Sequence, residues 1–300
     1  MFLNGLITND MKSLGLSSWM PAAFANVQGR LLAAVRIIHR EDGFLIDTEG
    51  PSREAVMKLI ERFTLAGDFK VADLTEKTTE LSVQGKTSRA VVEKVFGAQA
   101  AELERQKSLT GDFKGEAVTL IRATHTAEDG FDVFVNRGHL PTVRQALTNA
   151  DAQSVSEDAF ETLRIEAGVP RYGVDMDETN VVTETNLDDA VSFTKGCYVG
   201  QEIIVRIKHR GHVAKKMTGV VLEDMNPVPR DAKLSLADGK EIGRVTSSTF
   251  SPKLNRAIAL GYVKYDYCAP GTALKIHRVD GESDATVTEL PFVRGSWYIE

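Results

Sequence analysis

Apolar residues recur along the first quarter of the chain at spacings that predict an α/β unit. Residues 51–63 place apolar side chains three and four positions apart, which is the spacing of one helix face, and Pro51 suits the first turn of a helix. Residues 22–48 predict extended segments joined by turns, and residues 69–74 predict a further strand. The opening residues MFLNGLITND predict an amphipathic helix that begins almost at the first residue.

A second stretch repeats these kinds of element. It begins with a strand at residues 80–83 and a helix that carries Val91, Val92 and Val95. Strands at residues 117–123 and 131–135 follow, and a further helix closes the stretch. The predicted order is β-α-β-β-α-β, the split ferredoxin-like unit. We expect two copies of this unit, of which the first lacks its opening strand.

The pattern changes in the last third of the chain. A predicted helix over residues 157–168 is stopped by Gly168 and Pro170. After about residue 215, short alternating runs are separated by turns such as Asp238-Gly239. The predicted strands are residues 218–222, 233–236, 242–246, 257–263, 274–279 and 285–290. Many short strands at regular spacing predict a small β-barrel or sandwich.

These patterns together predict an α+β protein. Residues 1–210 would form a body of two interleaved ferredoxin-like halves, roughly residues 1–75 and 76–210. Residues 211–300 would form a small C-terminal β-barrel. A chain of 300 residues with 42% hydrophobic content has enough apolar surface for such a core.

Composition narrows the class of protein. The net charge of -6 and pI of about 5.6 argue against direct nucleic-acid binding. No apolar run approaches the length of a membrane span, and the start lacks the basic region of a signal peptide. Two cysteines, Cys197 and Cys268, provide no disulfide framework. We therefore expect a reduced, cytoplasmic protein that is a monomer and does not contact membranes.

Residues 195–202, with the sequence KGCYVGQE, combine reactive side chains in one short loop. Gly196 and Gly200 allow the backbone to bend. Lys195 lies two residues before Cys197, where its ammonium would favour the reactive thiolate. We predict that Cys197 acts as a nucleophile or transient ligand, with Lys195 assisting it. The alternative is a tight turn with an inert, half-buried thiol.

Several motifs occur in a family-specific order: FLNGLITND near the start, QGRLLA at 28–33, LRIEAGVPRYGVDMDE at 163–178, KGCYVGQE at 195–202 and RGHVAKKMTGV at 210–220. Over nearly the whole chain this pattern resembles the YgfZ-type folate-binding protein family, which is related to the aminomethyltransferase (T protein) of the glycine cleavage system. The resemblance implies a ring-like three-domain body with a central pocket for tetrahydrofolate or a derivative. It also implies a role in maturing or repairing iron–sulfur enzymes, including one that thiolates tRNA.

One segment separates this reading from a true T protein. T proteins resemble one another in a GG-x-x-DD segment whose aspartate lies near the reacting folate nitrogen. The corresponding residues 28–33 place Leu32 and Ala33 at the carboxylate positions. An aliphatic side chain cannot stabilise a developing iminium, so aminomethyl transfer would lose its main electrostatic group.

A second shared segment keeps its acid. Residues 125–131, HTAEDGF, resemble the T-protein segment YTGEDG, in which the glutamate hydrogen-bonds the pterin ring. A pterin presents an amino group and a ring N–H side by side, and one carboxylate can accept from both. We predict this role for Glu128. The alternative is that Glu-Asp-Gly forms an ordinary hairpin turn.

Other candidate ligand contacts rest on the resemblance and on position. The resemblance favours Arg164 as a pocket residue, and Tyr172 in the following loop could flank a ligand. We expect Tyr198, Gln201 and Glu202 to orient the Cys197 loop and to contact the folate.

Arg206 opens the most basic stretch of the chain, which ends at Lys216. This stretch is a candidate anion site for the folate's glutamate tail or for an acidic partner surface, and its alternative is a solvated face. His209 and His212 beside a single cysteine supply too few ligands for zinc or for a stable cluster, so we predict no resident metal.

The predicted function is a folate-binding accessory factor in iron–sulfur cluster assembly or repair, which supports tRNA modification indirectly and meets its iron–sulfur partners transiently. The rival is a tetrahydrofolate-dependent aminomethyl- or methyltransferase of the T-protein type, which would be an enzyme. A third possibility is a scaffold whose folate site has decayed.

Overall fold

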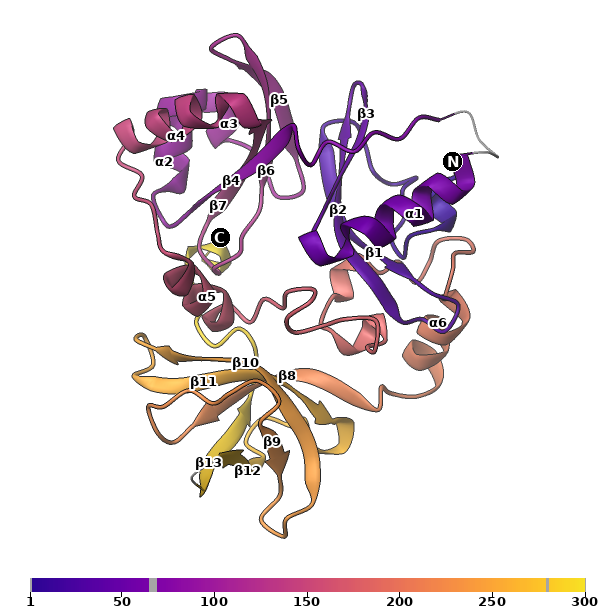
Figure 1. The fold of residues 1–300 in the computed structure, drawn as a ribbon, viewed down its shortest axis with the longest axis vertical. Coiled ribbons are helices and arrows are strands. Elements are labelled where there is room, and N and C mark those ends of the chain that lie inside the picture. Colours follow the sequence, from indigo (N-terminus) through magenta and orange to yellow (C-terminus); the bar gives the residue numbers. More distant parts are fainter. Residues whose placement is uncertain (1, 65–68, 279–280, 300) are drawn as a thin grey trace.

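The structure, a computed structural model, describes residues 2–64, 69–278 and 281–299. Figure 1 shows three lobes around a common centre: two α/β lobes side by side and a β-barrel beneath them. The α+β class with a C-terminal barrel is therefore confirmed. No helix within the described ranges has both the length and the apolar character that a membrane crossing requires.

The first lobe is a three-stranded antiparallel sheet covered by one helix. Its bounds are β1 (Ser18–Ala25), β2 (Leu31–Arg40), β3 (Gly43–Thr48) and α1 (Arg53–Thr64), with strand order β1-β2-β3. Val56 and Ile60 of α1 pack on Val35 and Ile37 of β2, as the predicted helix spacing requires. The predicted extended segments and the predicted helix are confirmed.

Two predictions for this lobe are wrong. Residues 69–74 form no strand, because Phe69 and Val71 pack against the core of the lobe without pairing to the sheet. The chain start holds only a short 3-10 helix, Leu3–Gly5, instead of an amphipathic helix. The carbonyls of the following residues accept hydrogen bonds from Lys195, a residue distant in sequence, instead of from a helical turn.

The second lobe is a four-stranded antiparallel sheet with helices on one face. Its bounds are β4 (Thr78–Gln84), α2 (Ser88–Phe96), α3 (Ala98–Ala101), β5 (Ser108–Phe113), β6 (Glu116–Arg122), β7 (Gly130–Asn136) and α4 (Leu140–Asn149). The strand order β4-β7-β6-β5 differs from the predicted β-α-β-β-α-β unit, because β5 forms a hairpin with β6. The pattern of SLTGDF concealed β5, since its central residues are polar and exposed.

The barrel closes through six antiparallel strands. They are β8 (Lys215–Leu222), β9 (Lys233–Ser235), β10 (Glu241–Ser251), β11 (Arg256–Lys264), β12 (Ala273–Arg278) and β13 (Gly281–Thr288), in the order β10-β11-β8-β13-β12-β9. Each predicted strand is confirmed, apart from the predicted end at Val279, which lies outside the described residues.

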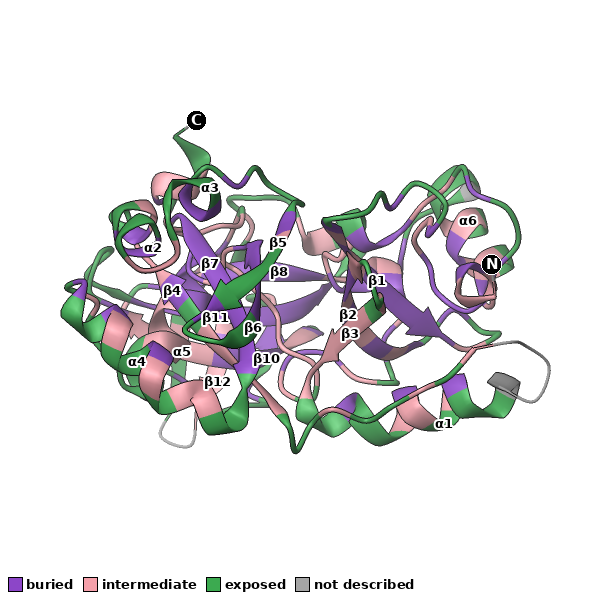
Figure 2. Cartoon of the chain, turned by 90° about the horizontal axis from the view of Figure 1, so that it is seen from above, coloured by how far each residue is buried: buried purple, intermediate pink, exposed green. Residues whose placement is uncertain are grey.

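The lobes are joined by a long segment of little regular structure between α5 (Glu157–Glu166) and α6 (Gln201–Arg210). Ile165 of α5 packs into an apolar cluster with Met217, Ile258 and Leu260 of the barrel. Figure 2 shows that the strands hold most of the buried residues, whereas the outer side of α1 is largely exposed. The division of the body at residue 75, and of the chain at residue 210, remains a prediction.

Candidate functional site

The Cys197 loop, residues 195–200, leads directly into α6. The thiol of Cys197 is exposed. Gly200 begins the helix with φ of +85°, and a Cβ on it would lie 2.5 Å from the carbonyl oxygen of Asn26. Only glycine tolerates both conditions, so the loop pattern reflects its shape as well as its chemistry.

Lys195 has a different role from the one predicted. Its side chain is buried, and its Nζ donates to the carbonyl oxygens of Asn4 (2.6 Å), Ile7 (2.8 Å) and Asn9 (2.6 Å). Burial lowers the pKa of Lys195 to about 8, so the ammonium is still the main form at neutral pH. Its three protons hold the N-terminal segment, and its assistance to Cys197 remains a prediction.

The other residues predicted in and after this loop differ in burial: Tyr198 is buried, whereas Glu202 and Arg206 are exposed. Tyr198 is buried, burial raises its pKa to about 12, and its hydroxyl has no hydrogen-bond partner among the described residues. Gln201 closes the loop by a long hydrogen bond of 3.5 Å to the Lys195 carbonyl. Glu202 and Arg206 are exposed on α6, so they do not share an enclosed site with Tyr198.

Tyr172 and Tyr198 are brought together. Both belong to the apolar cluster between the first lobe and the irregular segment, where Met176 and Val182 are fully or almost fully buried. Burial raises the pKa of Tyr172 as well, followed by the negative charges of Glu178 and Asp177. Their contact with a folate remains a prediction.

Arg164 is a structural residue and not the predicted ligand contact. It is buried beneath α5, and its guanidinium bonds to Glu161, Asp175, Ser247 and the Val169 carbonyl. These contacts use all five of its N–H donors. Arg164 therefore fastens α5 to the irregular segment and to the barrel.

Glu128 lies on the turn between β6 and β7. Ala127 before it has φ of +63°, a conformation that is uncommon for a residue other than glycine and that is found at functional turns. Oε2 of Glu128 accepts from the backbone N–H of Ser296 at 3.0 Å and from its hydroxyl. The carboxylate thus has the chemistry that a pterin requires, and a chain segment already uses it.

The positions of the missing T-protein carboxylates are apolar in the structure too. Ala33 is fully buried in the core of the first lobe, and Leu32 packs against the same core. Leu32 falls where the β1–β2 register shifts. Neither side chain offers a polar atom to a ligand.

The sequence analysis missed a charged cluster where the two sheets face each other. The junction network consists of Arg36, Asp47, Glu80, His125 and Asp132. Arg36 donates to Asp47 (2.5 Å), to Glu80 (2.9 Å) and to Asp132, while His125 Nε2 lies 2.9 Å from Asp132. A visible signal existed, because Arg36 and Asp132 interrupt otherwise apolar strands.

The pKa values of Glu80 and His125 are both raised in this network. Burial, followed by the charge of Asp132, raises the pKa of Glu80 to about 7. Burial alone would lower the pKa of His125, but the charge of Asp132 and their hydrogen bond outweigh it and raise the pKa. Glu80, His125 and Asp132 are close enough to share a metal ion, but the Arg36 guanidinium already neutralises these carboxylates.

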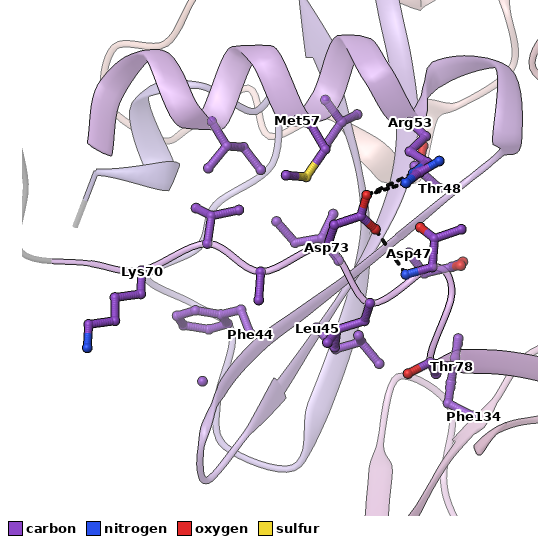
Figure 3. A pocket seen from close by; sticks show the side chains of 18 of the residues that line it. Phe44, Leu45, Asp47, Thr48, Arg53, Met57, Lys70, Asp73, Thr78 and Phe134 are labelled. Atoms are coloured by element: carbon purple, nitrogen blue, oxygen red, sulfur yellow. Dashed lines mark hydrogen bonds and ion pairs between the residues drawn. The ribbon is translucent and has the colours of Figure 1, made fainter. Parts of the chain in front are cut away.

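A large cavity lies under α1, and its lining includes Asp47 and Glu80 of the junction network. It measures about 1090 Å³ and is enclosed by α1, β3 and residues 69–75 (Figure 3). None of the predicted site residues lines it. Four acidic residues of its lining are paired with arginines: Asp73 with Arg53, Asp42 with Arg40, and both Asp47 and Glu80 with Arg36.

Two protein-family models match the α/β body and the barrel of this chain separately. A family model described as the GCVT N-terminal domain matches residues 1–195, and one described as the glycine cleavage T-protein C-terminal barrel domain matches residues 215–294. The aminomethyltransferase of Rubrobacter xylanophilus is 32% identical over 87% of this chain and 70% of that protein. The aminomethyltransferase of Halothermothrix orenii is 29% identical over 85% of this chain and 76% of that protein.

A solved structure shares the fold. The glycine cleavage system aminomethyltransferase T of Bartonella henselae matches with a TM-score of 0.86 over 98% of this chain and 81% of that chain, at 22% identity. The family is consistent with the folate cofactor expected from the sequence, whereas the YgfZ branch remains a prediction. With both of its domains matched, this chain belongs to the glycine cleavage T-protein family.

Proposed function

We propose that this protein binds tetrahydrofolate at the Glu128 turn and carries out folate-dependent one-carbon transfer of the aminomethyltransferase type. The observation that carries the proposal is the Glu128 carboxylate, held on a strained turn between β6 and β7. The relatives named aminomethyltransferase support the reaction class.

The turn is built to hold a carboxylate in one place. Asp129, next to Glu128, accepts from Arg122 at 3.0 Å and from Arg89 at 2.9 Å. Its own backbone carbonyl accepts from the Ser88 hydroxyl. These contacts of Asp129 fix the backbone of the turn, so they define where the neighbouring Glu128 carboxylate meets the amino and ring N–H groups of a pterin.

Calorimetry with tetrahydrofolate tests the site. Glu128→Ala should weaken binding by about 1.5–3 kcal/mol, the scale for a hydrogen bond to a charged group. The matched control is Glu289→Ala, which removes an exposed carboxylate just after β13, outside the Glu128 turn, and should bind normally. Equal affinities for the two variants would refute the assignment of Glu128.

The reaction is tested by ammonia release. Purified protein, an aminomethylated carrier and tetrahydrofolate should yield free ammonia and methylenetetrahydrofolate if the transfer is retained. Folate binding without any ammonia release would contradict this activity and favour a second candidate.

The second candidate is the iron–sulfur accessory factor, and a specific observation favours it. Leu32 and Ala33 provide no carboxylate, and the Cys197 thiol is exposed. In this case the protein is a cytoplasmic monomer of the YgfZ type whose iron–sulfur partners bind transiently.

Rescue of iron–sulfur enzyme activity, in cells that lack the native factor, tests this candidate. Cys197→Ser should abolish rescue, because serine keeps the size but removes the soft nucleophile. Cys268→Ser is the control, since Cys268 is half-buried and its thiol points to the Val263 carbonyl. Equal rescue by both variants would exclude a role for the Cys197 thiol.

A further inference from the structure

The chain's last described residues return from the barrel to the Glu128 turn. After β13 the chain passes α5, where the Val293 N–H donates to the Glu166 carbonyl at 3.0 Å. The C-terminus then lies between α5 and the second lobe (Figure 1). The segment 295–298, here called the C-terminal plug, makes the contacts that follow.

Ser296 occupies the Glu128 carboxylate with two donors. Its backbone N–H and its hydroxyl both donate to Oε2 of Glu128. The hydroxyl in turn accepts from the Asp129 N–H at 2.9 Å. These two donors occupy an oxygen that the amino and ring N–H groups of a pterin would also need.

Trp297 places a flat bicyclic ring beside the same turn. Its backbone N–H donates to the Ala127 carbonyl at 3.1 Å, and its indole ring lies 4.3 Å from the Arg105 guanidinium and 5.4 Å from that of Arg122. A guanidinium over an aromatic face is an attractive contact, and Arg105 and Arg122 could make the same contact with another planar heterocycle such as a pterin.

Gly295 makes this close approach possible. It is buried, and a Cβ on it would lie 2.6 Å from the Ala127 carbonyl oxygen and 2.6 Å from Oε1 of Glu128. No side chain fits there, so glycine lets the plug pass close against the Glu128 carboxylate.

We propose that the C-terminal plug imitates a pterin and holds the Glu128 site closed until folate displaces it. The inference rests on the proposed function, because it takes Glu128 as the pterin anchor. Plug and folate then exclude each other at one carboxylate. A plug that is closed about nine-tenths of the time would weaken the apparent affinity for folate about tenfold.

The experiment compares tetrahydrofolate affinity in the unaltered chain of residues 1–300, in Gly295→Ala and in a chain that lacks residues 295–300. Gly111→Ala is the matched control, because a Cβ there meets open space. We expect both plug variants to bind tetrahydrofolate about tenfold more tightly than the unaltered chain and the control. In a Trp19→Phe background, which leaves Trp297 as the remaining tryptophan, Gly295→Ala without folate and the otherwise unaltered chain with folate should show the same shift in fluorescence.

Other outcomes overturn the proposal in distinguishable ways. Equal or weaker binding by the plug variants, with Glu128→Ala still impaired, would refute the plug and leave the folate site standing. Absence of binding to every form would refute the proposed function and the plug together. The deletion guards against misfolding of Gly295→Ala, since it relieves the crowding without adding an atom.

Discussion

At the residue scale, the side chains that looked reactive in the sequence are divided between chemistry and support. Cys197 is exposed, but its neighbour Lys195 holds three carbonyls of the N-terminal segment. Arg164 likewise uses every donor to join α5 to its surroundings. A charged residue in a motif can therefore stabilise the structure around a site without taking part in its reaction.

Lys195→Met tests this structural role. Methionine keeps the length of the side chain, but it leaves the carbonyls of Asn4, Ile7 and Asn9 without their donor. Loss of a donor to buried acceptors should lower the free energy of unfolding by about 2–3 kcal/mol in urea denaturation. Lys208→Met, on the exposed side of α6, should change it little. If the two variants are equally stable, Lys195 does not hold the N-terminal segment.

At the scale of elements, helix α5 lies between the second lobe and the barrel (Figure 1), with Phe160 beside His125 and Ile165 packed on barrel residues. Its C-terminal end is formed by Gly168, whose φ is +69° and whose N–H donates to the Ile165 carbonyl. A Cβ on Gly168 would lie 3.0 Å from the side chain of Leu290, which follows β13. The end of this helix therefore fixes where the chain leaves the barrel toward the Glu128 turn.

Gly168→Ala should destabilise the protein. The left-handed conformation costs a residue with a Cβ about 1–2 kcal/mol, and crowding against Leu290 adds to that. Thermal or urea unfolding measures the loss, with Gly5→Ala as the control because it meets open space. A neutral Gly168→Ala would mean that the helix end relaxes without affecting the barrel contact.

At the scale of the whole molecule, the two sheets meet through an apolar cluster and the junction network. Ile38 of the first lobe packs with Ile121 and Phe134 of the second. Beside them, Arg36 joins carboxylates from β3, β4 and β7. Buried polar groups of this kind fix one arrangement of lobes, because any other arrangement leaves charges unpaired.

The network predicts that stability falls as pH rises through neutrality. The pKa of Glu80 is about 7 in the folded protein and 4.5 ordinarily. Between these two pH values the folded state keeps a proton that the unfolded chain has lost, so stability decreases as the pH rises across this range. The raised pKa of His125 acts in the same direction, since its contribution is lost as pH rises through the folded value. Asp132, whose pKa is lowered, reduces stability only when the pH falls below its ordinary value.

Thermal melts between pH 5 and 8 check this expectation. The unfolding temperature should decrease across this range, and Glu80→Gln should flatten the decrease. Glu116→Gln, an exposed position at the start of β6, is the control and should keep the original slope. A rising or flat profile for the unaltered protein would show that the network does not retain its protons on folding.

The sequence by itself determined the elements whose signal is local. Helix α1 and the six barrel strands follow from apolar spacing and turns, because burial of one face depends on residues a few positions apart. The Glu128 turn and the exposed Cys197 loop were also visible as motifs. The hairpin of β5 was missed, since its polar residues carry no period.

Tertiary structure alone decided which of these residues meet. Lys195 binds the carbonyl of Asn4 across 191 positions, and Ser296 reaches Glu128 across 168. Arg36 pairs with Glu80 and Asp132 from separate strands of the other sheet. Such contacts depend on how whole lobes pack, and no spacing along the chain encodes the partner of a buried charge. The pairing of these charges also decides which polar groups remain for a ligand.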